Sequence, residues 1–322
     1  MTERSSIPDY DRFGHRHSAR LKPVRHWVVY LLVRVLLAAT GPLPIGMLQR
    51  IGRGLGTAMH LFSTKFRRLC LVQLEMALPE LSQRERKRIG REVLRHQGMT
   101  LMETLALARF RREGGRWVHA EGEDALTGAH AEGRGVLLVT AHTGNWELLP
   151  IVLARHGIKA LAMVTVMTNP HLRKLAESVR DFEHLEITER GNPASPRQML
   201  RALKRGDALI MANDVDIDTN GVFVDFFGIP ANTPRASASL ALKLRAPLVT
   251  CFDRRLPDGT HCIRFERVPV TPEMLAGQDP VRALTQEVTR RMEDHIRRWP
   301  EQWVWNHRRW RRRPGTESDQ GA

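Results

Sequence analysis

The chain has 322 residues, 42% of them hydrophobic, which is enough for one large α/β domain with appended helices or for two small domains, and which excludes a wholly disordered protein. With 50 Lys and Arg against 35 Asp and Glu, the net charge is +15, which favours anionic partners such as nucleic acid, anionic lipid or an acidic carrier protein. The three cysteines, Cys70, Cys251 and Cys262, form no CxxC pair. The sequence therefore predicts neither a disulfide framework nor a structural zinc site, and it indicates reducing, cytoplasmic surroundings.

The N-terminal region is basic at first and then apolar. Residues 1–23 form a polar, basic segment, and an apolar run from Trp27 to Ala39 follows, interrupted only by Arg34. Because the run is shorter than the roughly 20 residues of a spanning helix, we expect a helix that spans marginally or lies at the membrane interface, with a buried core helix as the alternative. Residues 24–110 as a whole have helical spacing. Helices are expected at 45–64, 65–78 and 82–110.

From residue 111 to 314 the pattern changes to alternating strands and helices. This order predicts an α/β core with a mixed, largely parallel sheet flanked by helices. Strands are expected at 136–139, 160–166, 208–212, 221–227 and 247–252, with 261–268 as an antiparallel edge strand. Helices are expected at 146–153, 169–180, 196–204, 237–244 and 282–298. Residues 315–322 are a polar tail that we expect to be disordered.

The most informative motif is HTGNWE at residues 142–147, where an apolar strand ends and a helix begins. Ligands bind at such carboxyl ends of strands in open α/β sheets, so His142 is expected to face a cleft. A neutral imidazole can take the proton of an alcohol that attacks a thioester carbonyl, and Glu147 can hold the ring in the required tautomer. Backbone N–H groups near Gly144 and Asn145 could stabilise the resulting oxyanion. A His–Glu pair at this spacing also occurs by chance, as a solvent-exposed pair or a helix cap.

At these residues the chain resembles the lysophospholipid acyltransferase superfamily, whose mark is His-x4-Asp or Glu. More narrowly, it resembles the bacterial lipid A late acyltransferases, the lauroyl and myristoyl transferases, and their glycolipid-acylating relatives. The matching stretches are HTGNWE at 142–147, NDVD at 213–216 with GVFVDFFGIPANTP at 221–234, APLV at 246–249, and PEQWVWNHRRWRRRP at 300–314. The resemblance covers residues 24–314.

The resemblance implies an enzyme at the cytoplasmic face of the inner membrane. It would transfer a fatty acyl chain from acyl carrier protein, or from coenzyme A, to a hydroxyl of a membrane glycolipid such as a lipid A precursor. His142 would be the general base and Glu147 its partner, and this chemistry requires no metal or other cofactor. One position departs from the family pattern, because Thr165 stands where an arginine often lies four residues before the asparagine, here Asn169. An arginine expected to touch the substrate is therefore missing or is supplied from elsewhere.

Five further residues are candidates for substrate binding. Asn145 lies inside the catalytic block, and Asp214 and Asp216 follow an apolar strand, so they are expected at the same cleft, with loop capping as the alternative. Arg308 and Arg309 belong to the C-terminal signature and are expected to hold phosphates of the acceptor. No metal site is predicted, because the two aspartates lack further ligands at clear spacing.

The C-terminal signature also carries aromatic side chains, Trp303, Trp305 and Trp310, among its arginines. Such a cluster suits a bilayer interface or anionic headgroups, and it also suits nucleic acid, whose bases stack on aromatic rings. Two other functions stay open: a lysophospholipid or other glycolipid acyltransferase that uses acyl-coenzyme A, and a non-enzymatic basic protein of membrane surfaces or nucleic acid. The sequence has no helix-turn-helix, zinc-finger or RNP signature, which argues against nucleic acid. It has no GxSxG elbow, which argues against a serine hydrolase.

Overall fold

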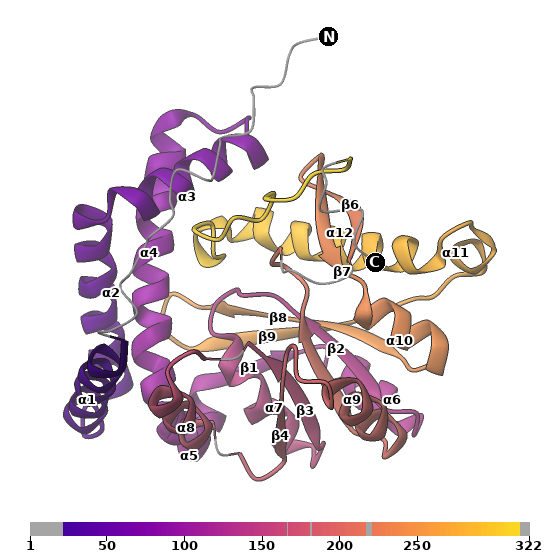
Figure 1. Ribbon diagram of the computed structural model, residues 1–322, viewed down its shortest axis with the longest axis horizontal. Coiled ribbons are helices and arrows are strands. Elements are labelled where there is room, and N and C mark those ends of the chain that lie inside the picture. Colours follow the sequence, from indigo (N-terminus) through magenta and orange to yellow (C-terminus); the bar gives the residue numbers. More distant parts are fainter. Residues whose placement is uncertain (1–21, 166, 181, 217–220, 316–322) are drawn as a thin grey trace.

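The computed structural model describes residues 22–165, 167–180, 182–216 and 221–315, so the predicted basic segment and polar tail lie almost wholly outside the described residues. The centre of the molecule is a seven-stranded sheet in the order β1-β9-β8-β2-β5-β3-β4 (Figure 1). Its strands are β1 (Val118–Glu121), β2 (Val136–Thr140), β3 (Ala160–Val164), β4 (Leu185–Glu189), β5 (Ala208–Ala212), β8 (Leu248–Arg255) and β9 (His261–Val268). All neighbouring strands run parallel except β8 and β9, which confirms the predicted α/β class.

Two strand predictions need correction. The strand expected at 221–227 forms as β6 (Gly221–Phe226), but it pairs with β7 (Ile229–Pro234) in a separate antiparallel hairpin. The strand expected at 261–268 does pair antiparallel with β8, yet it is not an edge, because the short β1 adds to its other side. The alternation that favours a strand is hard to recognise in only four residues, which is why β1 was not predicted.

Helices cover both faces of the sheet, as a largely parallel sheet requires. Along β2, Leu138 packs on one face while Leu137 and Val139 pack on the other, and all three are fully buried. The first face is covered by α5 (Leu107–Trp117), α6 (Glu123–Ala131) and α7 (Leu149–Arg155). The second face is covered by α9 (Ser195–Lys204), α10 (Ala236–Leu244) and α12 (Pro280–Arg298). The remaining helices of this region are α8 (Pro170–Val179) and the short α11 (Pro272–Ala276).

Four helices precede the sheet and form one side of the molecule (Figure 1). They are α1 (Lys22–Thr40), α2 (Ile45–Phe62), α3 (Thr64–Ala77) and α4 (Gln83–Leu105). The helix expected over 82–110 is two helices, because α4 ends at Leu105 and α5 begins at Leu107. Within the described residues, Pro23–Thr40 is the segment long and apolar enough to cross a membrane, and 6% of it is buried.

Close contact between α2 and α4 depends on glycine. A Cβ atom at Gly52 would lie 2.4 Å from the carbonyl oxygen of Gly98, and one at Gly56 would lie 2.1 Å from that of Leu94. No side chain fits at either distance, so the two backbones touch along this seam. The seam fixes α4 against α2 and leaves the other side of α4 to face the sheet.

A third apolar cluster lies above the carboxyl ends of the strands. The hairpin contributes the buried rings of Phe226 and Phe227. The C-terminal segment contributes Trp303, Trp305 and Trp310, and each of these three tryptophans is at most 1% exposed. These tryptophans are therefore not available to a bilayer or to stacked bases, contrary to either use predicted for them. Burial of three indole rings holds the C-terminal segment across the top of the sheet, next to α3 and α4.

Candidate active site

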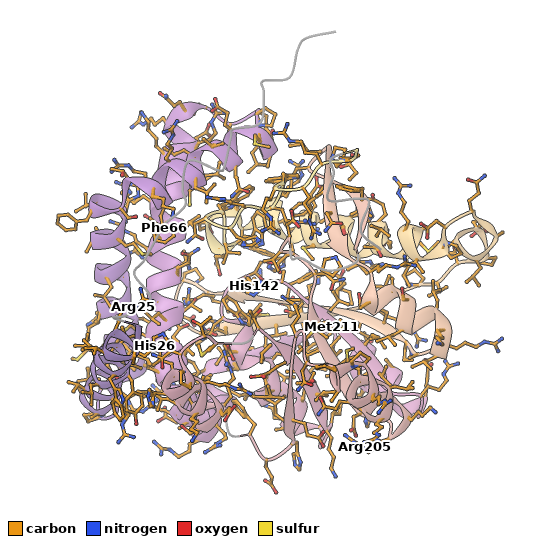
Figure 2. All side chains as sticks on the ribbon, viewed as in Figure 1. Arg25, His26, Phe66, His142, Arg205 and Met211 are labelled. Carbon is orange, nitrogen blue, oxygen red and sulfur yellow. The ribbon has the colours of Figure 1, made fainter. Side chains whose placement is uncertain are left out.

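The strand β2 delivers His142 to the carboxyl end of the sheet. Its five residues are all buried, and the chain then turns through Gly144, which has a φ of +55°. Asn145 caps the short 3-10 helix η3 (Trp146–Leu148), from which α7 continues. Figure 2 shows His142 near the middle of the molecule, between α4 and the sheet. The imidazole is 27% exposed and packs edge-on against the ring of Trp146.

The carboxylate of Asp214 holds His142 directly. Oδ1 of Asp214 lies 2.8 Å from Nδ1 of the imidazole, and Oδ2 accepts the backbone N–H of His142 at 2.7 Å. The indole Nε1–H of Trp303 donates to the same Oδ2 at 2.9 Å. Asp214 is thus fully buried with both oxygens engaged, and it fixes the position and the tautomer of the ring.

Strand register explains this contact. β2 and β5 are parallel neighbours in which Thr140 pairs with Ala212, and His142 and Asp214 each stand two residues further along. The two residues are 72 positions apart in the sequence. Equal offsets from a paired position bring them together at one point of the sheet edge.

The electrostatics of the pair favour a basic imidazole. Burial lowers the pKa of His142, but the charge and hydrogen bond of Asp214, with a smaller contribution from Glu147, raise it above its ordinary value. Burial raises the pKa of Asp214, while His142 and its other hydrogen bonds lower it to about 2. Asp214 is therefore ionised at neutral pH and stabilises a protonated imidazole.

Glu147 points to an arginine instead of to His142. Its Oε2 accepts from Nε of Arg180 at 2.7 Å, and its Oε1 accepts from the second guanidinium nitrogen. The side chain of Glu147 is 14% exposed, and that of Arg180 is 22% exposed. This hydrogen bond and charge raise the pKa of Arg180. Glu147 therefore affects His142 only through its charge. Asp214 makes the contact with His142 that is predicted for Glu147.

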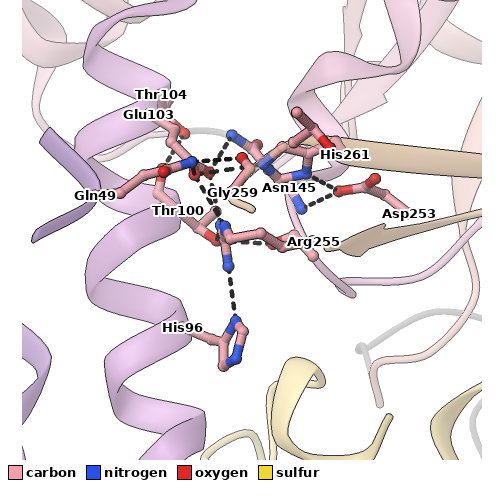
Figure 3. Close-up of polar contacts among 12 residues, drawn as sticks. Gln49, His96, Thr100, Glu103, Thr104, Asn145, Asp253, Arg255, Gly259 and His261 are labelled. Atoms are coloured by element: carbon pink, nitrogen blue, oxygen red, sulfur yellow. Dashed lines mark hydrogen bonds and ion pairs between the residues drawn. The ribbon is translucent and has the colours of Figure 1, made fainter. Parts of the chain in front are cut away.

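A buried ionic network supports the loop that carries His142 (Figure 3). The carboxylate of Glu103, on α4, accepts from Arg255 of β8 at 2.9 and 2.6 Å and from the side-chain amide of Asn145 at 3.2 Å. The carboxylate of Asp253 accepts the backbone N–H of Asn145 and, at 2.6 Å, Nδ1 of His261. Asn145, predicted to bind substrate, is wholly buried and fixes the loop from beneath.

Charge neutralisation inside the network is visible in its pKa shifts. Burial raises the pKa of Glu103, but Arg255 and His261 outweigh burial and lower it. Burial lowers the pKa of His261, but Asp253 and Glu103 raise it to about 9. For His96, burial and then the charge of Arg255 outweigh the opposing charge of Glu103 and lower its pKa to about 3. At neutral pH, His261 is therefore cationic and His96 is neutral.

The backbone donors expected to form an oxyanion hole are already engaged. The N–H of Gly144 donates to the carbonyl of Gln302 at 3.2 Å, and the N–H of Asn145 donates to Asp253. The N–H of Glu147 donates to Oδ1 of Asn145 at 3.3 Å. This corrects the expectation that these N–H groups stabilise an oxyanion.

Two other predicted substrate-binding residues hold the C-terminal segment. Asp216 is buried and accepts from the backbone N–H and from Nε of Arg312, at 2.9 and 2.8 Å. Arg309 is 0% exposed, donates to the carbonyl of Asn232, and lies 5.1 Å from the ring centre of Phe226. A guanidinium enclosed in this way does not reach a lipid headgroup. Arg308 is partly exposed and lies in the adjoining turn.

A mostly apolar cavity of about 540 Å³ opens in front of His142. Its walls come from α4, from the loop that carries His142, and from the C-terminal segment, including Leu101, Trp146, Val304 and His307. Among the described residues, no group of three or more His, Cys, Asp or Glu side chains is placed to hold a metal ion. The geometry is that of a base, a buried carboxylate and an apolar pocket.

A family model described as bacterial lipid A biosynthesis acyltransferase matches residues 15–312. The chain is 28% identical to the lipid A biosynthesis lauroyltransferase of Escherichia coli (strain K12), over 93% of this chain and 96% of that protein. It is 29% identical to the lipid A biosynthesis palmitoleoyltransferase of the same strain, over 91% and 94%. A phosphatidylinositol mannoside acyltransferase of Mycobacterium tuberculosis is 30% identical over 56% of each chain. The chain therefore belongs to the bacterial lipid A biosynthesis acyltransferase family.

Proposed function

We propose that this acyltransferase moves a fatty acyl chain from an acyl thioester of acyl carrier protein, or of coenzyme A, to a hydroxyl of a membrane glycolipid such as a lipid A precursor. The observation that carries the mechanism is the contact between Asp214 and Nδ1 of His142 at 2.8 Å. With Nδ1 carrying the proton that Asp214 accepts, Nε2 is the basic nitrogen of the ring.

Each step then has a named group. Nε2 of His142 takes the proton of the acceptor hydroxyl as its oxygen attacks the thioester carbonyl. When the tetrahedral intermediate collapses, the new C–O bond to the acceptor oxygen is kept and the C–S bond of the thioester breaks. The thiolate that leaves takes up the proton from His142, so the products are an ester and a thiol. Asp214 stabilises the imidazolium between the two proton transfers.

The oxyanion needs a donor other than the engaged backbone groups, and we assign this role to His307. Its ring lines the same cavity as His142, and its Nε2 is buried without a hydrogen-bond partner among the described residues. Burial lowers the pKa of His307, so the ring is neutral and has one N–H to donate. Asn306 exchanges amide hydrogen bonds with Gln97 at 2.6 and 2.9 Å, which fixes the neighbouring turn in advance of the reaction.

A polar cavity beside Arg180 supports a binding place for the polar part of the acceptor. A smaller cavity of about 240 Å³ is lined by Arg180, Arg173 and Thr165, among mainly polar residues. Nη1 of Arg190, the residue after β4, donates to the hydroxyl of Thr165 at 3.3 Å, so Arg190 is a candidate for the arginine that is expected to be supplied from elsewhere. We propose that sugar or phosphate groups bind here, with Glu147 holding the guanidinium of Arg180, and that the partly exposed Arg308 is the remaining candidate of the C-terminal signature for an anionic headgroup.

We propose that the enzyme acts at a membrane, on the cytoplasmic face of the inner membrane. All three cysteines are free and buried, which suits a reducing compartment. The exposed apolar side chains of α1 suit a membrane-associated enzyme. Burial of the C-terminal tryptophans argues against the nucleic-acid alternative, since it removes the stacking platform on which that function depends.

The test is acyl transfer to total membrane lipid by wild-type protein and by His142→Ala, with acyl carrier protein and coenzyme A as alternative carriers of a radiolabelled chain. A labelled glycolipid made only by wild-type protein supports the proposal, and its mass identifies the acceptor. Transfer by a folded His142→Ala variant at the wild-type rate would refute the assigned base. No product from either donor would refute the proposed reaction.

A further inference from the structure

Exposed apolar side chains are concentrated on the first helices of the molecule. Of the 17 large hydrophobic side chains that are exposed among the described residues, 13 lie between Val24 and Phe66. Seven of the 13 belong to α1, and the other six belong to α2 and the first turn of α3. The latter six lie outside the segment that qualifies as a membrane span. They form an apolar surface that the candidate span does not explain.

Helix α2 is apolar on two opposite sides. Its glycine side packs against α4, while its outward side carries Met47, Ile51, Leu55 and Phe62, at 44%, 38%, 45% and 85% exposure. Spacings of four and seven residues place these side chains in one row. Phe62 ends α2 at its corner with α3, where Leu61 is a further 62% exposed. The helix has no acidic residue.

A cationic cavity lies beside this corner. It has a volume of about 690 Å³, and six basic side chains line it: His60, Arg67, Arg84, Lys87, Arg88 and Arg91. Its one acidic side chain, Glu85, is bound to the backbone N–H and hydroxyl of Ser82 at 2.8 and 2.6 Å, in the capping box of α4. The cavity therefore presents an excess of positive charge and selects an anion.

The side chain of His60 shows that the positive charge acts inside the cavity. Its Nδ1 is buried and has no hydrogen-bond partner among the described residues. Burial, and then the charges of Arg67, Arg91 and Arg95, lower the pKa of His60. Burial and the surrounding guanidinium groups thus hold the imidazole neutral, so the positive charge of the cavity comes from its Arg and Lys side chains.

Helix α1 does not project away from the molecule. Near its start, the carbonyl of His26 accepts from the side-chain amide of Asn169 at 3.0 Å, and the ring of Trp27 lies 4.4 Å from that of His171. Just past its end, Arg109 donates to carbonyls of the following turn. A helix held to the core at both ends lies along the core, so α1 and α2 can meet the same membrane surface. In Figure 1, α1 lies next to one end of α2 and α3 lies at the other.

We propose that α2 and its corner with α3 are a second membrane contact, in which Phe62 and Leu61 enter the bilayer and the cationic cavity binds the phosphate of anionic phospholipid headgroups. A bilayer supplies both chemistries at one place, acyl chains for the exposed rings and phosphates for the arginines. A bilayer can also cover the neighbouring apolar surface of α1, whereas an acidic protein partner does not account for that surface. A single weak hydrophobic anchor binds a membrane reversibly. Because Arg34 interrupts the apolar run of α1, a second point of attachment at α2 would strengthen the membrane binding of α1.

The test places a label at the corner. The native cysteines are at most 3% exposed, so Phe62→Cys gives one reactive site for an environment-sensitive fluorophore. Leu275→Cys is the matched control, because Leu275 is apolar, 56% exposed and on α11, on the opposite side of the molecule (Figure 1). Each labelled full-length protein is mixed with phosphatidylcholine vesicles that either contain or lack phosphatidylglycerol, together with phospholipids spin-labelled in the acyl chain.

Quenching at position 62 but not at 275, strengthened by phosphatidylglycerol, is the expected result. The triple variant Arg84→Gln, Arg88→Gln, Arg91→Gln should weaken the phosphatidylglycerol-dependent quenching by about tenfold or more. An unquenched label at 62 on protein that still floats with vesicles would overturn the proposal. Quenching that is the same without phosphatidylglycerol would overturn the headgroup site. Protection of the label by purified acyl carrier protein in the absence of lipid would assign the corner to a protein instead. None of these readouts depends on acyl transfer, so the outcome is independent of the proposed function.

Discussion

Replacement of Asp214 by Asn tests the assignment of the catalytic carboxylate. The side chain keeps its size, but one of its two acceptor oxygens becomes an NH₂ group. In the wild-type protein, Oδ2 of Asp214 accepts two N–H groups, from the backbone of His142 and from Trp303. The amide oxygen of the variant is therefore expected to take the position of Oδ2. The NH₂ group then faces Nδ1 of His142, so Nδ1 must be the unprotonated nitrogen that accepts its hydrogen bond. The proton moves to Nε2, which can no longer act as the base.

The expected loss is large because the geometry survives while the tautomer is wrong. The equivalent change in a serine-protease triad lowers kcat by about 10⁴-fold, which corresponds to about 5 kcal/mol of barrier. KM should change little. Asp214 is the largest of the interactions that raise the pKa of His142, so burial dominates without it and the pKa falls. Since the base must be neutral to act, the acid limb of kcat against pH should move to lower pH.

Glu147→Gln is the matched control for this experiment. Its charge also raises the pKa of His142, but by less than Asp214, and its carboxylate is bound to Arg180. The control should therefore shift the acid limb less than Asp214→Asn, whatever its effect on kcat. The assay is acyl transfer from the active thioester donor, with kcat and KM measured from pH 5 to 9. A folded Asp214→Asn variant with a wild-type acid limb and less than tenfold loss of kcat would refute this reasoning.

Three further predictions concern the network beneath the loop. Glu103→Gln removes the charge that compensates the buried Arg255 and should lower the free energy of unfolding by about 3–5 kcal/mol, measured by urea denaturation. Gly144→Ala adds a Cβ atom 2.3 Å from Oδ2 of Asp253 at a φ of +55°, so it should lower Tm and reduce kcat by about 10²-fold or more. His261 has a pKa raised from 6.5 to about 9, so it stabilises the fold fully below pH 6.5. That stability, at most about 3 kcal/mol, should be lost between pH 6.5 and 9 in urea titrations.

Matched variants separate these effects from general damage. Gly115→Ala adds the same methyl group where nothing lies within 4 Å, and it should leave Tm and kcat near wild-type values. A Glu103→Gln, Arg255→Met double variant should recover part of the lost stability, because no charge is then left unpaired. His261→Gln should flatten the decline in stability toward pH 9. A decline of unchanged slope in that variant would assign it to another group.

The position of His142 was predictable from the sequence, whereas its bonded partner was not. An apolar strand that ends at Thr140, followed by a glycine turn and a helix, places the next polar side chain at a cleft by local rules alone. The contact with Asp214 depends on β5 being the neighbour of β2, and strand order is set by tertiary packing. The local His-x4-Glu spacing drew attention to Glu147, but a partly buried arginine, Arg180 at the C-terminal cap of α8, binds that side chain.

Composition was misleading in the C-terminal signature for a related reason. A run rich in Arg and Trp suggests surface chemistry, because isolated arginines are seldom buried. Here the hairpin β6–β7 provides Arg309 with the carbonyl of Asn232, the hydroxyl of Thr233 and the ring of Phe226, and Trp303 donates to Asp214. These contacts become apparent only when the hairpin is folded next to the C-terminal segment. The signature is therefore a part of the active-site wall, which explains how His307 comes to face the cavity.

Helix α4 links the proposed membrane contact to the catalytic loop. Arg91 lines the cationic cavity, and nine residues later the hydroxyl of Thr100 donates to the carbonyl of Gly144 at 2.7 Å, a helical rise of about 14 Å. Glu103, one turn further, holds Asn145 and accepts from Gln49 of α2 at 2.9 Å. The same helix thus fixes the loop and carries the groups proposed to meet the headgroups. Because α2 and α4 are in backbone contact at the glycine seam, we expect the orientation of α2 on a membrane to fix the orientation of α4 as well. On the proposed membrane contact, we therefore expect α4 to set the height of His142 above the lipid surface, and this height to select which hydroxyl of the proposed acceptor can reach the imidazole.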